Sequence, residues 1–178
     1  MKNLTTYITE KMIYKKSVVT NYKYFPKTKD ELKELLEKLI DERGNKGDFN
    51  NSDTSEITDM SKLFKDMDKF NGDISKWDVS NVKNTLGMFA WCKSFNQPLN
   101  EWDVSNITNT RYMFWGCMSF NQPLDNWNVS NVKNMENMFC RCYDFNQDIS
   151  NWNVSNVIDM EDMFQNCPIE EKYKPKFK

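Results

Sequence analysis

The chain has 178 residues, a formal net charge of −2 and no histidine. Without an imidazole it can form neither a serine–histidine triad nor a histidine metal site, and we expect it not to be an enzyme. Residues 49–169 carry nine Lys and Arg against sixteen Asp and Glu, so this part repels phosphate backbones and nucleic acid is not expected as its partner.

No stretch of eighteen apolar residues occurs, and we therefore expect no membrane-spanning segment. The first residues, MKNLTTYITEKMIYKK, are interrupted by polar side chains and lack the apolar core of a secretion signal. As given, the sequence predicts a cytoplasmic protein.

The first segment of the chain, residues 1–48, does not share the pattern that follows it. We predict two helices here, one from Leu4 to Tyr14 and one from Lys29 to Arg43. Before the second helix, Thr28 and Glu31 have the spacing of a capping box. One stripe of this helix is apolar and comprises Leu32, Leu35, Leu36, Leu39 and Ile40.

We interpret residues 1–48 as a helical N-terminal cap, because the open end of a repeat stack needs a cover with a polar outer side. The alternative is a docking helix for a partner or for a membrane surface. In that case a run of cations would supply the attraction, namely Lys11, Lys15, Lys16 and Lys23.

From about Ser52 the sequence repeats every 25 residues without a gap, in five copies of which the first and last are incomplete. Such a period is typical of stacked units that cannot bury their apolar faces alone. We assign residues 49–169 to the repeat and residues 170–178 to a C-terminal tail. We expect the recurring apolar side chains to form continuous buried columns, including Trp77, Trp102, Trp127 and Trp152; Val79, Val104, Val129 and Val154; and Phe64, Phe89, Phe114, Phe139 and Phe164.

Within one copy, two spacings of apolar residues follow each other. Residues 100–105 alternate, with Trp102 and Val104 on one side, and this predicts a short strand. From Thr108 onward the apolar residues are three and four apart, which predicts one or two helical turns. Residues 96–98, with the sequence NQP, then lead the chain into the next strand.

The repeated unit, W-[DN]-V-S-N-[VI]-x-[ND]-[MT]-x-x-M-F-x-x-C-x-x-F-N-Q, resembles the BspA-like leucine-rich repeats of bacterial surface proteins over about residues 52–169. The resemblance implies an α/β fold: a short right-handed leucine-rich solenoid with a parallel sheet on its concave face, here preceded by the α-helical cap. It also implies binding rather than catalysis, at the cell surface. The stretch YFPKTKDELKELL looks like the leaders of short repeat proteins encoded by phages and mobile elements.

Four of the five cysteines fall in one column of the repeat, at positions 92, 117, 142 and 167. Met67 takes the same place in the first copy, which indicates an apolar slot of that size. We expect buried thiols one coil apart, at a distance that permits bridging but serves packing. Cys140 lies outside the column, and neither a metal nor a cofactor is expected.

Two sets of side chains are candidates for binding a partner. Trp91 and Trp115 lie between Phe and Cys on the expected helical side and are candidate exposed anchors. The other set comprises the outward residues of the expected strands, which would form the concave face: Lys76, Asp78, Glu101, Asp103, Asn126, Asn128, Asn151 and Asn153.

These observations favour a non-enzymatic protein–protein interaction module on a rigid repeat scaffold, with a protein as its partner. One alternative is a phage or mobile-element structural component that self-associates through its open C-terminal coil. Another is a bacterial surface adhesin exported by an unusual route.

Overall fold

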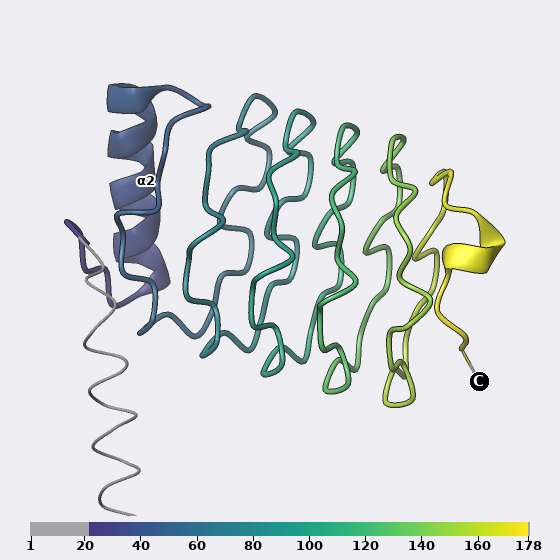
Figure 1. Cartoon of the computed structure of the whole chain (residues 1–178). Coiled ribbons are helices and arrows are strands. Elements are labelled where there is room, and N and C mark those ends of the chain that lie inside the picture. Colours follow the sequence, from purple (N-terminus) through teal and green to yellow (C-terminus); the bar gives the residue numbers. More distant parts are fainter. Residues whose placement is uncertain (1–21, 178) are drawn as a thin grey trace, which may run out of the picture.

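The computed structural model describes residues 22–177 (Figure 1). These residues contain one α-helix, α2 (Lys29–Arg43), and one short 3₁₀ helix, η1 (Glu171–Tyr173). Between them the chain winds into coils that lie side by side in a row, with α2 at one end and η1 at the other. The helix expected from Leu4 to Tyr14 lies outside the described residues.

Helix α2 has the predicted bounds, and its ends follow from local hydrogen bonds. The Thr28 hydroxyl accepts from the Glu31 amide (3.2 Å), while the Glu31 carboxylate accepts from the Lys27 amide (2.7 Å). At the other end, Gly44 has a φ of 75° and its amide donates to the Ile40 carbonyl (2.8 Å).

Helix α2 packs on the first coil through its apolar stripe. Leu32, Leu36 and Leu39 are completely buried and belong to the same core as the repeat. At the rim of this contact, the Lys29 ammonium group donates to Asp59 (3.0 Å) and to Ser61 (3.1 Å). The helix therefore covers one end of the row of coils, as an N-terminal cap would.

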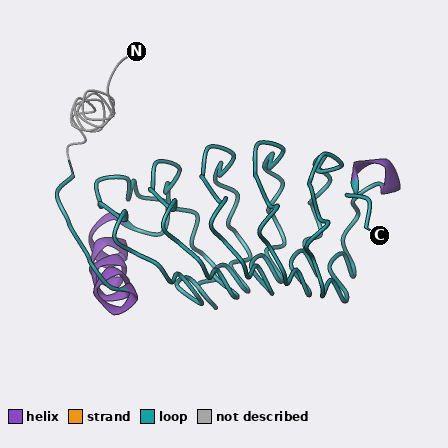
Figure 2. Ribbon diagram, turned by 90° about the horizontal axis from the view of Figure 1, so that it is seen from below, coloured by secondary structure: helices purple, strands orange, loops and turns teal. Residues whose placement is uncertain are grey.

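The prediction of a leucine-rich solenoid with a parallel sheet is wrong. Residues 22–177 contain no β-strand, and in Figure 2 the coils are drawn as loops and turns throughout. Isolated parallel bridges replace the sheet, and along the repeat they join Asp59, Asn84, Asn109, Asn134 and Asp159.

Coils are joined by a regular ladder of backbone hydrogen bonds on the side where helical turns were expected. Each coil contributes an eight-residue ladder segment, and every second amide of that segment donates to the next coil. In one step, the amides of Thr85, Gly87, Phe89 and Trp91 donate to carbonyls 24 residues later at 2.7 to 3.0 Å. The five ladder segments comprise residues 59–66, 84–91, 109–116, 134–141 and 159–166.

All sixteen of these bonds point the same way, and this explains why no strand forms. In a parallel β-sheet a strand both donates to and accepts from the same neighbour. Here, beyond the isolated bridge at its first residue, a segment donates to the following coil and accepts from the preceding one. The backbone achieves this by left-handed residues such as Tyr112 (φ 57°) and Gly116 (φ 72°), between turn bonds such as Met113 amide to Thr110 carbonyl (3.0 Å).

The expected strand at residues 100–105 is a pair of tight turns. The Trp102 amide donates to the Leu99 carbonyl (3.1 Å), and the Asp103 carboxylate accepts from the Ser105 amide (3.1 Å). Trp102 and Val104 both point into the core, which accounts for the alternating sequence without a strand. Coils meet here through side chains, because the Trp102 indole N–H donates to the Ile74 carbonyl of the preceding coil (3.2 Å).

The prediction of continuous buried columns is confirmed. The four repeat tryptophans are 3 to 4% exposed. Phenylalanine rings stack from coil to coil, with ring centroids 5.3 Å apart between Phe64 and Phe89 and 5.5 Å between Phe89 and Phe114. The column cysteines are free thiols that donate to carbonyls of the preceding coil, at 2.8 Å from Cys92 to Phe64.

The C-terminal tail closes part of the far end of the row. The Glu170 amide donates to the Asn146 side chain (2.9 Å), which extends a ladder of asparagine side chains through the coils. The Ile149 amide then donates to the Tyr173 carbonyl (3.0 Å). Residues 170–177 thus lie against one side of the last coil.

Candidate partner-binding surface

The residues expected on a concave strand face lie at the turns instead. Glu101, Asp103, Asn126 and Asn128 are exposed, as are Lys76, Asn151 and Asn153, while Asp78 is half-buried. Because no strand is present, the prediction that they form one face of a sheet is wrong.

Several of these side chains serve the turns in which they lie. One oxygen of the residue at the Asp78 position accepts from the amide two residues later in every copy, as Asp78 does from Ser80 (3.0 Å) and Asn128 from Ser130 (3.2 Å). Asn151 donates to the Asp125 carbonyl of the preceding coil (2.8 Å). The recurrence of Asp and Asn along this edge is therefore explained by turn formation.

Differences between the copies of the repeat single out another surface. In each ladder segment the central pair is constant, Met or Leu followed by Phe, and it is buried except for Phe164 of the last segment, which is half-buried. The two positions before this pair and the two after it change from copy to copy. We call these positions the variable face: Ser61, Lys62, Lys65 and Asp66; Leu86, Gly87, Ala90 and Trp91; Arg111, Tyr112, Trp115 and Gly116; Glu136, Asn137, Cys140 and Arg141; Glu161, Asp162, Gln165 and Asn166.

The backbone ladder explains why these positions are free to vary. The hydrogen bonds between coils are made by main-chain atoms, so they place no demand on the side chains. The Met–Phe pair fills the core, while residues of the variable face such as Tyr112 and Arg141 reach the surface. The fold thus holds the variable face on a scaffold of constant geometry.

Three aromatic side chains form the centre of the variable face. The ring centroids of Trp91 and Trp115 are 5.1 Å apart, and those of Tyr112 and Trp115 are 5.3 Å apart. All three side chains are half-buried. We call Trp91, Tyr112 and Trp115 the aromatic cluster, and it spans the second and third ladder segments.

Arg111 frames one side of the aromatic cluster. Its guanidinium group pairs with Glu136 (2.8 Å) and donates to the Tyr112 hydroxyl (3.1 Å), which itself donates to Glu136 (2.8 Å). The hydrogen bond with Tyr112 and the pairing with Glu136 raise the pKa of Arg111. The Arg111 Nε atom is enclosed and has no hydrogen-bond partner among the described residues.

Arg141 frames the other side. Its guanidinium carbon lies 5.9 Å from the ring centroid of Trp91, which is a cation–π distance. A hollow of about 390 Å³ opens beside the same indole and is lined by Asp66, Asp68, Trp91 and Lys93. The aromatic cluster therefore lies between two arginines, with an acidic recess next to it.

The sequence interpretation found part of this surface. It predicted Trp91 and Trp115 as anchors, and the structure brings these two residues together. It missed Tyr112, Arg111 and Arg141, each of which is ordinary when considered alone. Comparing the five copies with one another would have pointed to them, because the positions that they occupy are among the most variable of the repeat.

Within residues 22–177 there is no group of three or more Cys, Asp or Glu side chains arranged to hold a metal ion. The same part of the chain contains no helix that is long and apolar enough to cross a membrane.

These features define a repeat protein whose 25-residue coils share one core and differ on one outer face. The family described as "Mycoplasma protein of unknown function, DUF285" matches residues 31–142 and again residues 98–173. The chain belongs to this family. Neither the curated proteins nor the solved structures gave a match.

Proposed function

We propose that the chain is a non-enzymatic protein–protein interaction module that binds a protein partner on the variable face. The observation that carries this proposal is the contrast within each ladder segment. A constant pair, Met or Leu followed by Phe, packs into the core, and it is flanked by positions that change from copy to copy and mostly reach the surface. A surface that only had to be soluble would be filled with small charged residues. Here its centre holds aromatic and arginine side chains instead.

The composition of this centre supports binding to a protein. Trp, Tyr and Arg are the residues enriched at the energetic centres of protein interfaces. Their side chains are already packed on one another, as Trp115 is on Trp91 and Tyr112, so little rotamer freedom remains to be lost on binding. The ion pair with Glu136 likewise restricts the rotamers of Arg111 beside the aromatic cluster.

The repeat pattern supports the same kind of role. It resembles that of BspA-like surface proteins, and we propose that the chain shares their binding function. The leucine-rich fold that this resemblance implied is wrong for this chain, so the proposed contact is the variable face and not a concave sheet.

A pulldown with the full chain as bait tests the proposal. Extracts and surface fractions of cells would be probed with three baits: the wild type, the double variant Tyr112→Ala/Trp115→Ala, and the control Glu101→Lys/Asp103→Lys on the turn edge. We expect bound proteins, quantified by mass spectrometry, to fall at least about tenfold with the first variant, as the loss of two interface anchors would give. The control is expected to retain them.

Two outcomes would contradict the proposal. Loss of partners with the control alone would move the contact to the turn edge. Retention of the same partners by both variants would exclude the variable face. Far-ultraviolet circular dichroism of each bait establishes that both variants are folded.

A further inference from the structure

The last ladder segment, residues 159–166, has hydrogen-bond partners for only half of its backbone amides. Its carbonyls accept from the preceding coil, as that of Glu161 does from Asn137 (2.9 Å). The four amides that point the other way donate to no carbonyl within residues 22–177. They belong to Met160, Asp162, Phe164 and Asn166.

The four earlier segments show what these amides are built to meet. At each step between coils, the equivalent four amides donate to carbonyls of alternate residues in the next segment at 2.7 to 3.0 Å. The end of the row is therefore one half of an interface that the molecule forms four times. Met160, Asp162 and Asn166 are exposed, so this edge is accessible to a ligand that supplies carbonyls in place of water.

Apolar side chains are exposed at the same end. Ile158 is 84% exposed and Met160 is 41% exposed, and of the other large hydrophobic residues in the repeat only Tyr143 is as exposed as these. Phe164 stacks on Phe139 at 5.9 Å but has no further ring on its other side, and it is half-buried where the earlier members of its column are completely buried.

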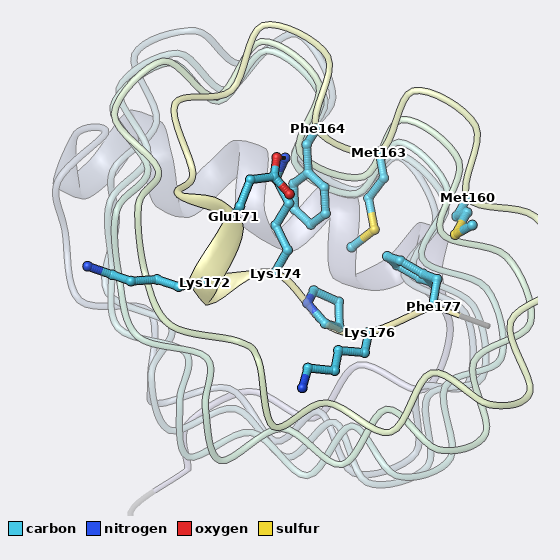
Figure 3. A pocket seen from close by; sticks show the side chains of 9 residues that line it. Met160, Met163, Phe164, Glu171, Lys172, Lys174, Lys176 and Phe177 are labelled. Carbon is cyan, nitrogen blue, oxygen red and sulfur yellow. Dashed lines mark hydrogen bonds and ion pairs between the residues drawn. The ribbon is translucent and has the colours of Figure 1, made fainter.

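The C-terminal tail fills this place only in part. Its backbone bonds to the opposite side of the last coil, through Ile149 and Asn146, and the Lys174 ammonium group lies 5.6 Å from the ring centroid of Phe164. Between the tail and the ladder segment lies a hollow of about 460 Å³. Figure 3 shows Phe164, Met163 and Phe177 around it, with Lys174 beside Phe164 and Lys176 below.

The structure of the other end of the row limits which molecule can bind at the open C-terminal end. A second copy could continue the row only with its own first ladder segment, whose outward side α2 covers through Leu32, Leu36 and Leu39. Two copies meeting at their C-terminal ends would set amide against amide. Neither of these two arrangements fits, which favours an extended segment of another polypeptide as the occupant.

We propose that the open C-terminal end binds an extended peptide segment of another protein by backbone pairing. Carbonyls of four alternate residues accept from Met160, Asp162, Phe164 and Asn166. The side chain that follows the third of these carbonyls is aromatic and stacks on Phe164 in place of the Lys174 ammonium group, as Phe164 itself stacks on Phe139. An apolar neighbour on the peptide fills the hollow between Met160 and Phe177. The site lies apart from the aromatic cluster and does not depend on the function proposed for it.

A ladder segment of this chain is the natural probe, because it carries the required pattern. The synthetic peptide ITDMSKLFKDM, residues 57–67, contains the constant Leu–Phe pair and no cysteine. It would be added to the full chain while amide hydrogen exchange is followed by nuclear magnetic resonance. We expect exchange at Met160, Asp162, Phe164 and Asn166 to slow by about tenfold or more at saturation, since bonded amides exchange only on opening.

Variants of peptide and protein sharpen the test. The same peptide with Ala in place of its Phe, and the surface variant Met160→Glu, are each expected to weaken binding at least about fivefold. Trp115→Ala on the variable face is expected to leave it unchanged, which separates this site from the one proposed above. Protection of other amides, or none, would overturn the proposal. So would protection of the same four amides without peptide in a sample that sedimentation shows to be dimeric, because the occupant would then be a second copy.

Discussion

The indole of Trp91 lies directly over Gly116 of the next coil. A Cβ atom built on Gly116 would be 2.7 Å from the Cε3 atom of Trp91, closer than real Cβ atoms come to any carbon. Because Trp91 in turn packs on Trp115 and under Arg141, Gly116 determines the packing of the aromatic cluster without contributing a side chain.

Gly116→Ala should displace the Trp91 indole. We expect the free energy of unfolding to fall by about 1 to 3 kcal/mol, from the crowding and from the left-handed backbone at φ 72°. Gly87→Ala is the matched control, because Gly87 is also left-handed (φ 58°) but its nearest side-chain atoms would be 3.7 Å away. Denaturant unfolding and near-ultraviolet circular dichroism measure both. Equal losses in the two variants would show that the Trp91 contact is immaterial.

Trp102→Phe should destabilise the stack from its middle. The change removes the indole hydrogen bond to the Ile74 carbonyl and leaves a space in a column where Trp102 is 4% exposed. We expect a loss of about 2 to 4 kcal/mol, since an unpaired buried carbonyl and a cavity both contribute. Guanidinium unfolding curves give the value. Tyr143→Phe, at an exposed position, is the control and is expected to change little.

The attachment of α2 should weaken at low pH. Burial alone would raise the pKa of Asp59, but hydrogen bonds from the Ser61 amide and from Lys29 outweigh it and hold this pKa below its ordinary value. A carboxyl group of this kind stabilises the fold above its unfolded pKa of about 3.9, and the contribution is lost as the pH falls through the lower folded value.

Urea midpoints measured from pH 7 to pH 2.5 test this linkage. Below about pH 4 the wild type should lose more stability than Asp59→Asn, which cannot titrate there. The absolute effect is modest, because Asp59 and Lys29 are both partly exposed. Glu37→Gln, on the outer side of α2, is the control and should follow the wild type. Identical curves for wild type and Asp59→Asn would contradict the assignment.

The column cysteines should differ in reactivity along the row. Burial raises the pKa of the Cys117 and Cys142 thiols well above its ordinary value, and that of Cys167 to about 11. Cys167 is also half-buried, at the uncovered end. Iodoacetamide labelling of the native protein at pH 8, followed by peptide mass spectrometry, should therefore modify Cys167 before the other two. Labelling of Cys117 at the same rate would show that the core opens as a whole.

Much of the fold could be predicted from the sequence, because the repeat period and the recurring apolar residues indicate which side chains are buried. The helix of residues 29–43 carries its own capping and stripe signals. What failed was the local conformation of the coil. A spacing of two, as in Trp102 and Val104, also arises in a tight turn that buries both side chains. A spacing of three, as in Phe114 and Cys117, also arises from the turn bond between these two residues (2.9 Å).

The backbone ladder could hardly be predicted from the residue types of the sequence. Left-handed positions are usually recognised by glycine, but here Tyr112, Asn137 and Asp162 occupy one such column. The contacts of these residues with the neighbouring coils offset the strain of the left-handed backbone. Conformational preferences of single residues do not include such contacts. Of the aromatic cluster, only the two tryptophans were predicted from the sequence. The variability of the arginine positions between copies points to the two arginines beside the cluster, but only the structure shows that they lie on the same surface as the tryptophans.

The uniform direction of its bonds makes the ladder electrically polar. In a β-sheet the peptide dipoles of a strand alternate and largely cancel, whereas the four ladder dipoles of each coil add along the axis, as they do in an α-helix. Fewer backbone bonds outside the ladder, such as those from the Lys83 and Ser94 amides to the preceding coil, point the other way. The end at residues 159–166 is consequently the positive pole, and the end beneath α2 is the negative one. Placing Lys29 at the negative pole is favourable. Lys172 and Lys174, near the positive pole, are each paired with a glutamate, Glu170 and Glu171 respectively.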